Sequence, residues 1–452
     1  MINLRALLFL FLASPALAQQ PALVGYLPQW GETNDPPWAA KQLVTSGSMK
    51  LLTQINYSQA FINDGRCVVA NPETDLNHRY DAANSVDGTA DPIVPALDTP
   101  AQPGAAPGAP ASGPSAPGVS GSSAPVLRGA FHQLQELRQR YPRTRLLISI
   151  EGKASAFADA AQPAKREAFV ASCVDVFLRG NLGFGLRAPG LFNGIDVDWE
   201  YPNGPGAGGM SDGANFTALM VEFRRQLDLY GAATHTRPML TIAVGAGLRR
   251  YPGVDWPLVA RSVDQVGLMN YDYNGPWQKL TGIIAPLYPI PGQQQESGTI
   301  DGTVTDYETA GVPPAKLLMG IPFYGYHWSG VTDAGAQHGL GMTGKPDHDD
   351  SPYWKIAALP GVATPFRDPH SQAPWSYDGK DFWTFDDPAS AAAKAGYSRE
   401  HALGGMMIWE LSGDTADGAM LKAMARALAH GGAAAHPVVS QATAPDAQSA
   451  AR

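Results

Sequence analysis

Short apolar segments recur along the chain and alternate with stretches whose apolar residues return every three to four positions. The first kind of segment is typical of buried strands and the second of amphipathic helices. The predicted strands occupy residues 21–31, 51–62, 145–152, 192–201, 238–245, 264–272, 316–325 and 403–410. The predicted helices occupy residues 126–141, 165–179, 215–230 and 419–430. Strands that alternate with helices indicate an α/β fold built on a parallel sheet.

Length and composition agree with one large folded unit. The chain has 452 residues, of which 44% are hydrophobic, and a single (β/α)8 barrel with insertions fits that length. Residues 81–124 are rich in Pro, Ala, Gly and Ser and poor in aromatic residues, so we expect a disordered insertion there. The Ala-rich residues 431–452 are expected to form a disordered tail.

The N-terminus and the charge bear on location and partners. A basic residue, a short apolar run and Ala16-Leu17-Ala18 predict a signal peptide over residues 1–18 and therefore a secreted protein. The run is shorter than the roughly 20 residues of a membrane-spanning helix. The formal net charge of −9 argues against nucleic acid and membrane partners. Pairing of Cys67 with Cys173 stays open, because two cysteines do not make a disulfide framework.

The predicted strand at 192–201 carries the strongest chemical signal. Its period of two puts Asp196, Asp198 and Glu200 on one face and three apolar side chains on the other. Carboxylates about 6.6 Å apart along a strand repel one another, so at least one should have a raised pKa, as a general acid requires. A calcium cluster or a solvated strand face are the alternatives.

A second polar group follows the predicted strand within residues 264–277. Met269, Tyr271 and Asp272 stand at the strand end, and Trp277 lies beyond them. Barrel enzymes place function at the C-terminal ends of their strands. Taken alone, a core Met and Tyr with a capping Asp is an equally good interpretation.

These motifs together resemble the family 18 glycoside hydrolases, which include the chitinases. Asp196, Asp198 and Glu200 match the family's Asp-x-x-Asp-x-Asp-x-Glu strand, with Asn193 in place of the first Asp. Ser149 and Gly152 match its Ser-x-Gly-Gly strand, with Glu151 replacing the first Gly. Further matches are the Met-x-Tyr-Asp strand, the seventh strand at 316–325 and the eighth strand ending in Trp409. The resemblance covers nearly all of residues 21–430.

The resemblance implies an architecture and a set of residue roles. It implies a (β/α)8 TIM barrel over residues 19–430, with a small α+β insertion at 327–384 between strand 7 and helix 7. Glu200 would be the acid and then the base, and Asp198 would hold the substrate's acetamido N–H. Asp196 would share a proton with Asp198, Tyr271 would donate to the acetamido oxygen, and Asp272 would grip the sugar. The substrate-binding residues would be Trp409, Met269, Trp277, Tyr26, Trp30, Tyr324 and Ser149.

The expected function is that of a secreted, monomeric chitinase acting on chitin or N-acetylglucosamine oligosaccharides. The alternatives are a non-catalytic chitin-binding lectin on the same fold and a hydrolase of related N-acetylated glycans. No cofactor is implied. The cluster Asp347-His348-Asp349-Asp350 is interpreted as a solvated loop, and we predict no metal site. The effect of Glu151 on the pH optimum stays open.

Overall fold

The computed structural model describes residues 21–34, 36–93, 125–204, 211–290, 298–332, 337–362 and 364–429. The predicted signal peptide (1–18) and tail (431–452) lie outside the described residues. Within them, no helix combines the length and the apolar character needed to cross a membrane.

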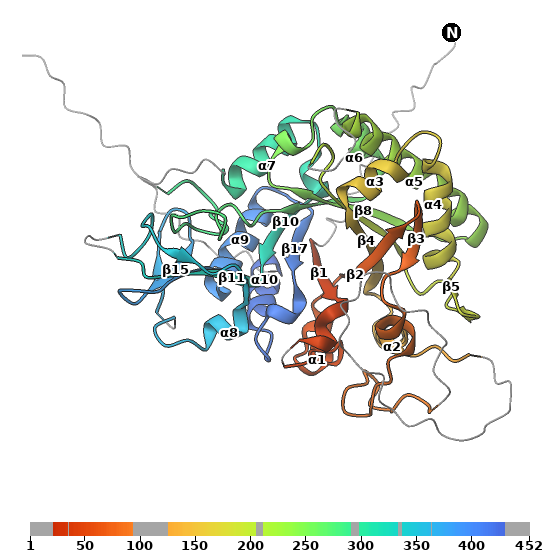
Figure 1. The fold of residues 1–452 in the computed structure, drawn as a ribbon, viewed down its shortest axis with the longest axis horizontal. Helices are drawn as coiled ribbons and strands as arrows, with labels where there is room; N and C mark the ends of the chain where they lie inside the picture. The colour runs from red at the N-terminus through yellow and green to blue at the C-terminus, as the bar shows by residue number, and fades with distance from the viewer. Residues whose placement is uncertain are drawn as a thin grey trace, which may run out of the picture.

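Eight parallel strands close into a barrel, which confirms the predicted (β/α)8 fold (Figure 1). Closure comes from pairing of the first strand with both the second and the last. The strands are β1 (Ala22–Pro28), β2 (Gln54–Asn63), β4 (Arg145–Lys153), β7 (Gly194–Glu200), β8 (Met239–Gly245), β9 (Gln265–Met269), β10 (Leu317–Pro322) and β17 (Gly405–Trp409). A short strand, β3 (Arg66–Val69), forms an antiparallel hairpin with β2.

Helices follow the barrel strands and cover their outer faces. They are α1 (Lys41–Thr45), α2 (Gly129–Arg140), α3 (Ala154–Ala160), α4 (Arg166–Cys173), α5 (Asp212–Thr234), α6 (Trp256–Ser262), α7 (Ile300–Thr309), α9 (Pro388–Glu400) and α10 (Ala419–Ala429). On β7 the apolar parity packs outward against them. Trp199, for example, is fully buried and stacks on Phe157 of α3, with ring centroids 5.4 Å apart. The alternate, acidic side chains of the same strand therefore point into the barrel interior.

A second, antiparallel sheet lies between β10 and α9, beside the barrel on the left of Figure 1. Its elements are β11 (Tyr324–Ser329), β12 (Lys345–Pro346), β13 (Ser351–Pro352), β14 (Phe366–Arg367), β15 (Pro374–Tyr377) and β16 (Phe382–Phe385), with helix α8 (Tyr353–Ala357). The sheet therefore extends from residue 324 to residue 385, whereas the insertion is predicted at 327–384.

The single strand predicted at 316–325 is wrong, because it is two strands in two different sheets. β10 pairs in parallel with β9 and β17, and β11 pairs antiparallel with β16. Only Phe323 separates them. The run contains no charged residue after Lys316, so its hydrophobic pattern does not show where the pairing partner changes. Tyr324 consequently belongs to the insertion and not to the barrel.

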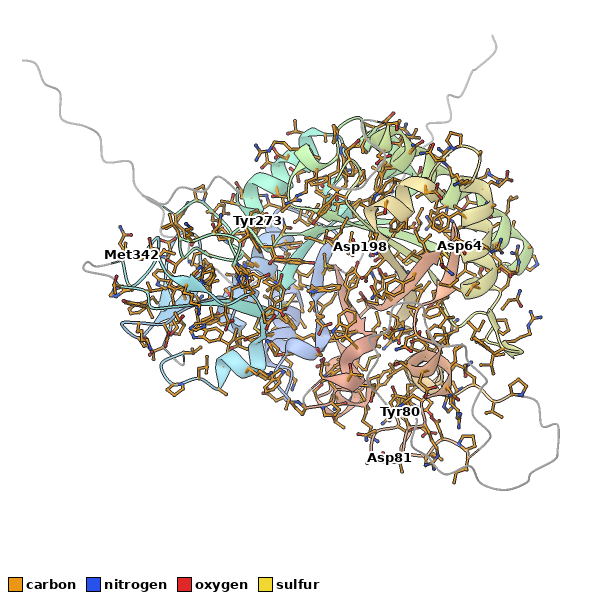
Figure 2. All side chains as sticks on the ribbon, viewed as in Figure 1. Asp64, Tyr80, Asp81, Asp198, Tyr273 and Met342 are labelled. Atoms are coloured by element: carbon orange, nitrogen blue, oxygen red, sulfur yellow. A yellow bond between two sulfur atoms is a disulfide. The ribbon has the colours of Figure 1, made fainter. Side chains whose placement is uncertain are left out.

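The predicted disordered insertion starts at residue 81, but the first part of it is ordered in the structure. Residues 81–93 are described and pack on α2 (Figure 2, where Tyr80 and Asp81 are labelled at the lower edge). Ser85 and the backbone of Asp87 donate hydrogen bonds to the Glu136 side chain. These polar contacts and the buried side chain of Val86 hold the segment, although its composition is poor in large apolar residues. Residues 94–124 lie outside the described part of the chain.

Cys67 of β3 and Cys173 of α4 form a disulfide, which answers the pairing question that the sequence left open. The bond joins the β2–β3 hairpin to the outer helix layer. It spans 106 residues of sequence, including the whole segment between β3 and α4.

Candidate active site

The acidic side chains of β7 enter the barrel and rise toward its C-terminal mouth. Asp196 is 1% exposed and Asp198 is 4% exposed, while Glu200 ends the strand and opens to solvent. Figure 2 shows Asp198 near the centre of the molecule, where the barrel strands converge. Alternate residues of the strand thus form an acidic ladder, in which Asp196 and Asp198 are buried and Glu200 is accessible to solvent.

Asp196 is held by three hydroxyl groups from three other barrel strands. Tyr26 Oη donates to Asp196 Oδ2 at 2.6 Å, and Ser149 Oγ donates to the same oxygen at 2.9 Å. Thr241 Oγ1 donates to Oδ1. Burial raises the pKa of Asp196, and these hydrogen bonds oppose that rise.

Tyr26 and Ser149 are predicted to bind substrate, but the structure directs their hydroxyls to Asp196 and places neither residue among those that line the cleft. Thr241 was missed by sequence reasoning. A threonine in an apolar strand carries no motif, and only the barrel register, which pairs it with Asp196, reveals its role.

Asp198 sits above this cage with an oxygen that has no partner. Its Oδ1 atom is buried and accepts no hydrogen bond from the described residues. Burial raises the pKa of Asp198 well above its ordinary value, and the charges of Glu200, Glu151 and Asp196 raise it further. A buried acceptor without a donor costs free energy, so this oxygen could accept a hydrogen bond from a donor outside the protein.

Glu200 stands at the mouth of the barrel next to Asp198. Desolvation by the surrounding protein raises the pKa of Glu200, and the charge of Asp272 adds to the rise. A hydrogen bond with Tyr201 and the charge of Arg250 lower it in part. The guanidinium of Arg250 lies 4.5 Å from the Tyr201 ring centroid, within the range of a cation–π contact. A carboxyl group with a raised pKa at an accessible position suits a general acid.

A cleft of about 840 Å³ opens over these carboxyl groups. Its lining includes Asp198, Glu200, Tyr271, Asp272, Met269, Trp277, Tyr324 and Trp409, which are all predicted site residues. Trp30 instead lines an adjoining hollow of about 480 Å³ that shares Tyr324 and Trp409 with the cleft. The Trp30 and Trp409 ring centroids lie 6.0 Å apart. The two hollows together therefore contain the predicted aromatic residues except Tyr26.

The insertion fixes one wall of this cleft through Asp272. Tyr324 Oη and Tyr326 Oη, both from β11, donate to Asp272 Oδ1 at 2.7 and 3.0 Å. Asp272 has a backbone φ of 59°, in the left-handed region that Asp tolerates better than most residues. Burial raises the pKa of Asp272 and the two tyrosines oppose the rise. Sequence analysis missed Tyr326, because the insertion shows no barrel motif.

The two departures from the family pattern have different surroundings. Asn193 Oδ1 accepts from the Leu146 amide at 2.9 Å, so an amide oxygen serves in a structural bridge below the site. Glu151 instead enters the barrel, where Ser58 Oγ donates to its carboxyl group. Burial raises the pKa of Glu151 to about 7, and the charge of Glu200 contributes to the rise.

One group among the described residues could hold a metal ion. Asp91, His132 and Glu136 bring ligand atoms within 4.8 Å of one another. The group ties the 81–93 segment to α2, His132 Nδ1 already lies 2.6 Å from Asp91, and none of the three lines the cleft. The Asp347–Asp350 cluster does not form such a group. Asp91, His132 and Glu136 therefore fit a structural network that ties the 81–93 segment to α2.

The fold and the cleft define a class of protein. A (β/α)8 barrel that carries stacked carboxyl groups and exposed aromatic rings at the C-terminal ends of its strands is built as a glycoside hydrolase. The chain belongs to the glycosyl hydrolases family 18, whose model matches residues 22–414.

The relatives that it matches include bacterial chitinases. The chain is 31% identical over 408 residues to Chitinase C of Streptomyces lividans, covering 87% of this chain and 58% of the relative. It is 33% identical over 312 residues to Chitinase A1 of Niallia circulans, covering 64% and 43%. The chain thus spans about half the length of these relatives. A solved structure of the catalytic domain of psychrophilic chitinase B from Arthrobacter TAD20 matches with a TM-score of 0.76 at 31% identity, covering 91% and 96%.

Proposed function

We propose that the protein is a chitinase that cleaves β-1,4 linkages between N-acetylglucosamine units with retention of configuration. The proposed substrates are chitin and its oligosaccharides. The buried, unpartnered Oδ1 of Asp198 beside the accessible Glu200 is the observation that carries the proposal.

The Asp198 oxygen fits one feature of such a substrate. An N-acetylglucosamine unit in the cleft offers an amide N–H at its second carbon, and a buried carboxylate is a strong acceptor for it. That hydrogen bond would orient the acetamido oxygen toward the sugar's own anomeric carbon. Hydrolysis assisted by the substrate in this way needs no nucleophile from the enzyme.

The steps then divide between the two carboxyl groups. Glu200 gives its proton to the glycosidic oxygen while the acetamido oxygen bonds to the anomeric carbon and the leaving sugar departs. The resulting cyclic cation carries its positive charge next to Asp198, which stabilises it. Glu200, now ionised, takes a proton from water as that water attacks the anomeric carbon from the side that the leaving group vacated. The bond between the acetamido oxygen and the anomeric carbon breaks, which restores the acetamido group, and the anomeric configuration is retained.

Supporting roles follow from the geometry around this pair. Tyr271 lines the cleft and would donate to the acetamido oxygen, and Asp272, held by two tyrosines, would accept from a sugar hydroxyl. Asp196 would tune Asp198 from below, and proton sharing between them stays a prediction. Trp409, Trp277 and Trp30 would give pyranose rings apolar faces to stack on.

Two other functions remain alternatives on the same fold. A lectin would need no acid, so the presence of Glu200 at an open position favours an enzyme. Hydrolysis of other N-acetylated glycans would use the same carboxyl groups. A cleft with one wall from the insertion, and an adjoining hollow that shares Tyr324 and Trp409 with it, favours a polymer of this sugar. We also propose that the protein is secreted, after cleavage near Ala18, and acts as a monomer.

A reporter assay tests the proposal. The wild-type protein should release the reporter from chitobiose and chitotriose glycosides, and Glu200→Gln should lower the rate by about 10² to 10⁴, the usual contribution of a general acid. Glu167→Gln, on the exposed surface of α4, is the matched control and should keep full activity. Binding of oligosaccharides without turnover in the wild type would favour the lectin, and absence of both would favour other glycans.

A further inference from the structure

A carboxyl group that the proposed mechanism does not use enters the barrel beside the site. Glu151 lies on β4 in direct register with Asp198 on the neighbouring strand β7. Register partners on adjacent parallel strands lie about 4.8 Å apart and project to the same side of the sheet. Glu151 therefore belongs to the same interior layer as Asp198, although it is only half-buried.

Ser58 fixes this carboxyl group from the other side. It is fully buried on β2, the strand that flanks β4 opposite β7, and its Oγ donates to Glu151 Oε1. Three adjacent strands thus hold Ser58, Glu151 and Asp198 side by side. The arrangement leaves Glu151 little freedom to turn away from the site.

The charges that face Glu151 are nearly all negative. They come from Asp196, Asp198 and Glu200 on β7 and from Glu410 after β17. β2 presents the uncharged Ser58, and Lys153 on its own strand is exposed at the strand end. The charge of Glu151 is one of those that raise the pKa of Asp198, together with the charges of Glu200 and Asp196.

We propose that Glu151, held by Ser58 beside Asp198, is a positioning residue that keeps a proton on the Asp198–Glu200 pair and so extends hydrolysis to higher pH. This proposal rests on the proposed function. Asp196 has its oxygens engaged by three hydroxyls, whereas Glu151 places a second carboxyl group in direct register with Asp198.

The direction of the effect follows from the charges. Below neutral pH Glu151 is protonated and exerts little field on its neighbours. As the pH rises past its pKa of about 7, its negative charge opposes ionisation of Glu200 and Asp198. Glu200 then stays protonated, and competent as an acid, to higher pH. The acid limb of the activity profile, measured while Glu151 is neutral, should not depend on it.

Two substitutions separate charge from shape. Glu151→Gln keeps the size of the side chain and an oxygen for Ser58, but removes the charge. We expect an alkaline limb displaced to lower pH, with kcat/KM near pH 8 reduced about tenfold, and an unchanged acid limb. Ser58→Ala removes the hydrogen bond that lowers the pKa of Glu151, so Glu151 ionises later and the alkaline limb should move the same way by a smaller amount. In the double variant Ser58→Ala should add nothing to Glu151→Gln.

The experiment is the pH dependence of kcat/KM on a chitobiose reporter, for the wild type, both single variants and the double variant. Glu136→Gln is the matched control, because Glu136 also has its carboxyl group held by a serine hydroxyl, Ser85, but lies on α2, outside the barrel interior that holds Asp198. Its profile should coincide with that of the wild type.

The proposal is overturned by an alkaline limb that does not move in Glu151→Gln, by additive effects in the double variant, or by an equal shift in Glu136→Gln. If Glu151→Gln fails to fold, Ser58→Ala decides alone, because an unmoved limb in that variant contradicts the proposal. A wild-type protein without turnover overturns the proposed function itself, which distinguishes the two failures.

Discussion

Removal of the Tyr26 hydroxyl should destabilise the protein in a pH-dependent way. Tyr26→Phe deletes one of the three hydrogen bonds on Asp196, a donor at 2.6 Å between two buried groups, and leaves the ring in place beside Trp409. A hydrogen bond to a charged group contributes about 1.5–3 kcal/mol, and one between neutral groups about 0.5–1.5 kcal/mol. The loss should therefore be larger when Asp196 is ionised.

The sign follows from the pKa of Asp196. Burial raises this pKa in the folded state, so ionisation of Asp196 already costs stability as the pH rises through its folded value. Tyr26→Phe removes an interaction that lowers the pKa, and so raises it further. Well above the folded pKa the variant should lose about 1.5–3 kcal/mol of unfolding free energy. As the pH falls and Asp196 becomes protonated, the loss should shrink toward about 0.5–1.5 kcal/mol.

Urea unfolding of the wild type and the variant across a range of pH values measures this difference. Tyr307→Phe is the matched control, because Tyr307 is also fully buried but donates to a neutral acceptor, the Gly245 carbonyl oxygen, at 2.9 Å. Its loss should be modest and should not change with pH. A loss in Tyr26→Phe that is the same at every pH, or as small as in the control, would refute the reasoning.

Three further changes test other parts of the structure. Replacing Cys67 and Cys173 together by Ser should lower the unfolding free energy by about 4–5 kcal/mol, because the disulfide closes a loop of 106 residues; an unchanged urea midpoint would contradict this. Lys394→Met should cost about 3–5 kcal/mol in the same assay, since it leaves the buried Asp386 carboxylate without its cation, whereas the pair Lys394→Met with Asp386→Leu should recover most of the loss. Trp277→Ala should raise KM for long oligosaccharides and leave the urea midpoint unchanged, because Trp277 is 59% exposed at the cleft; a destabilised variant would show a packing role instead.

The barrel and its acidic ladder could be predicted because both depend on local alternation. The parity of Asp196, Asp198 and Glu200 follows from the strand itself, and so does the burial of Trp199 on the other face. The position of Tyr271 just after the end of a strand likewise predicts that it lies at the cleft. Such features need no knowledge of which strands are neighbours.

The partners of these residues could not be predicted, because they depend on register between strands far apart in the sequence. Thr241 reaches Asp196, and Ser58 reaches Glu151, only once the barrel closes. Tyr326 lies on β11, which follows β10 after a single residue, so the hydrophobic pattern does not show that the chain has left the barrel. Tyr26 and Ser149 are predicted to bind substrate, yet their hydroxyls donate to Asp196 and neither residue lines the cleft.

The most direct test of the account concerns the acetamido group of the substrate. Reporter chitobiosides whose acetamido methyl carries none, one, two or three fluorines differ in the nucleophilicity of the acetamido oxygen and little in size. If that oxygen attacks the anomeric carbon while Asp198 holds the N–H, kcat/KM should fall with each added fluorine. A rate that is indifferent to fluorination would contradict the account, since it would mean that the bond to the anomeric carbon is formed by another group.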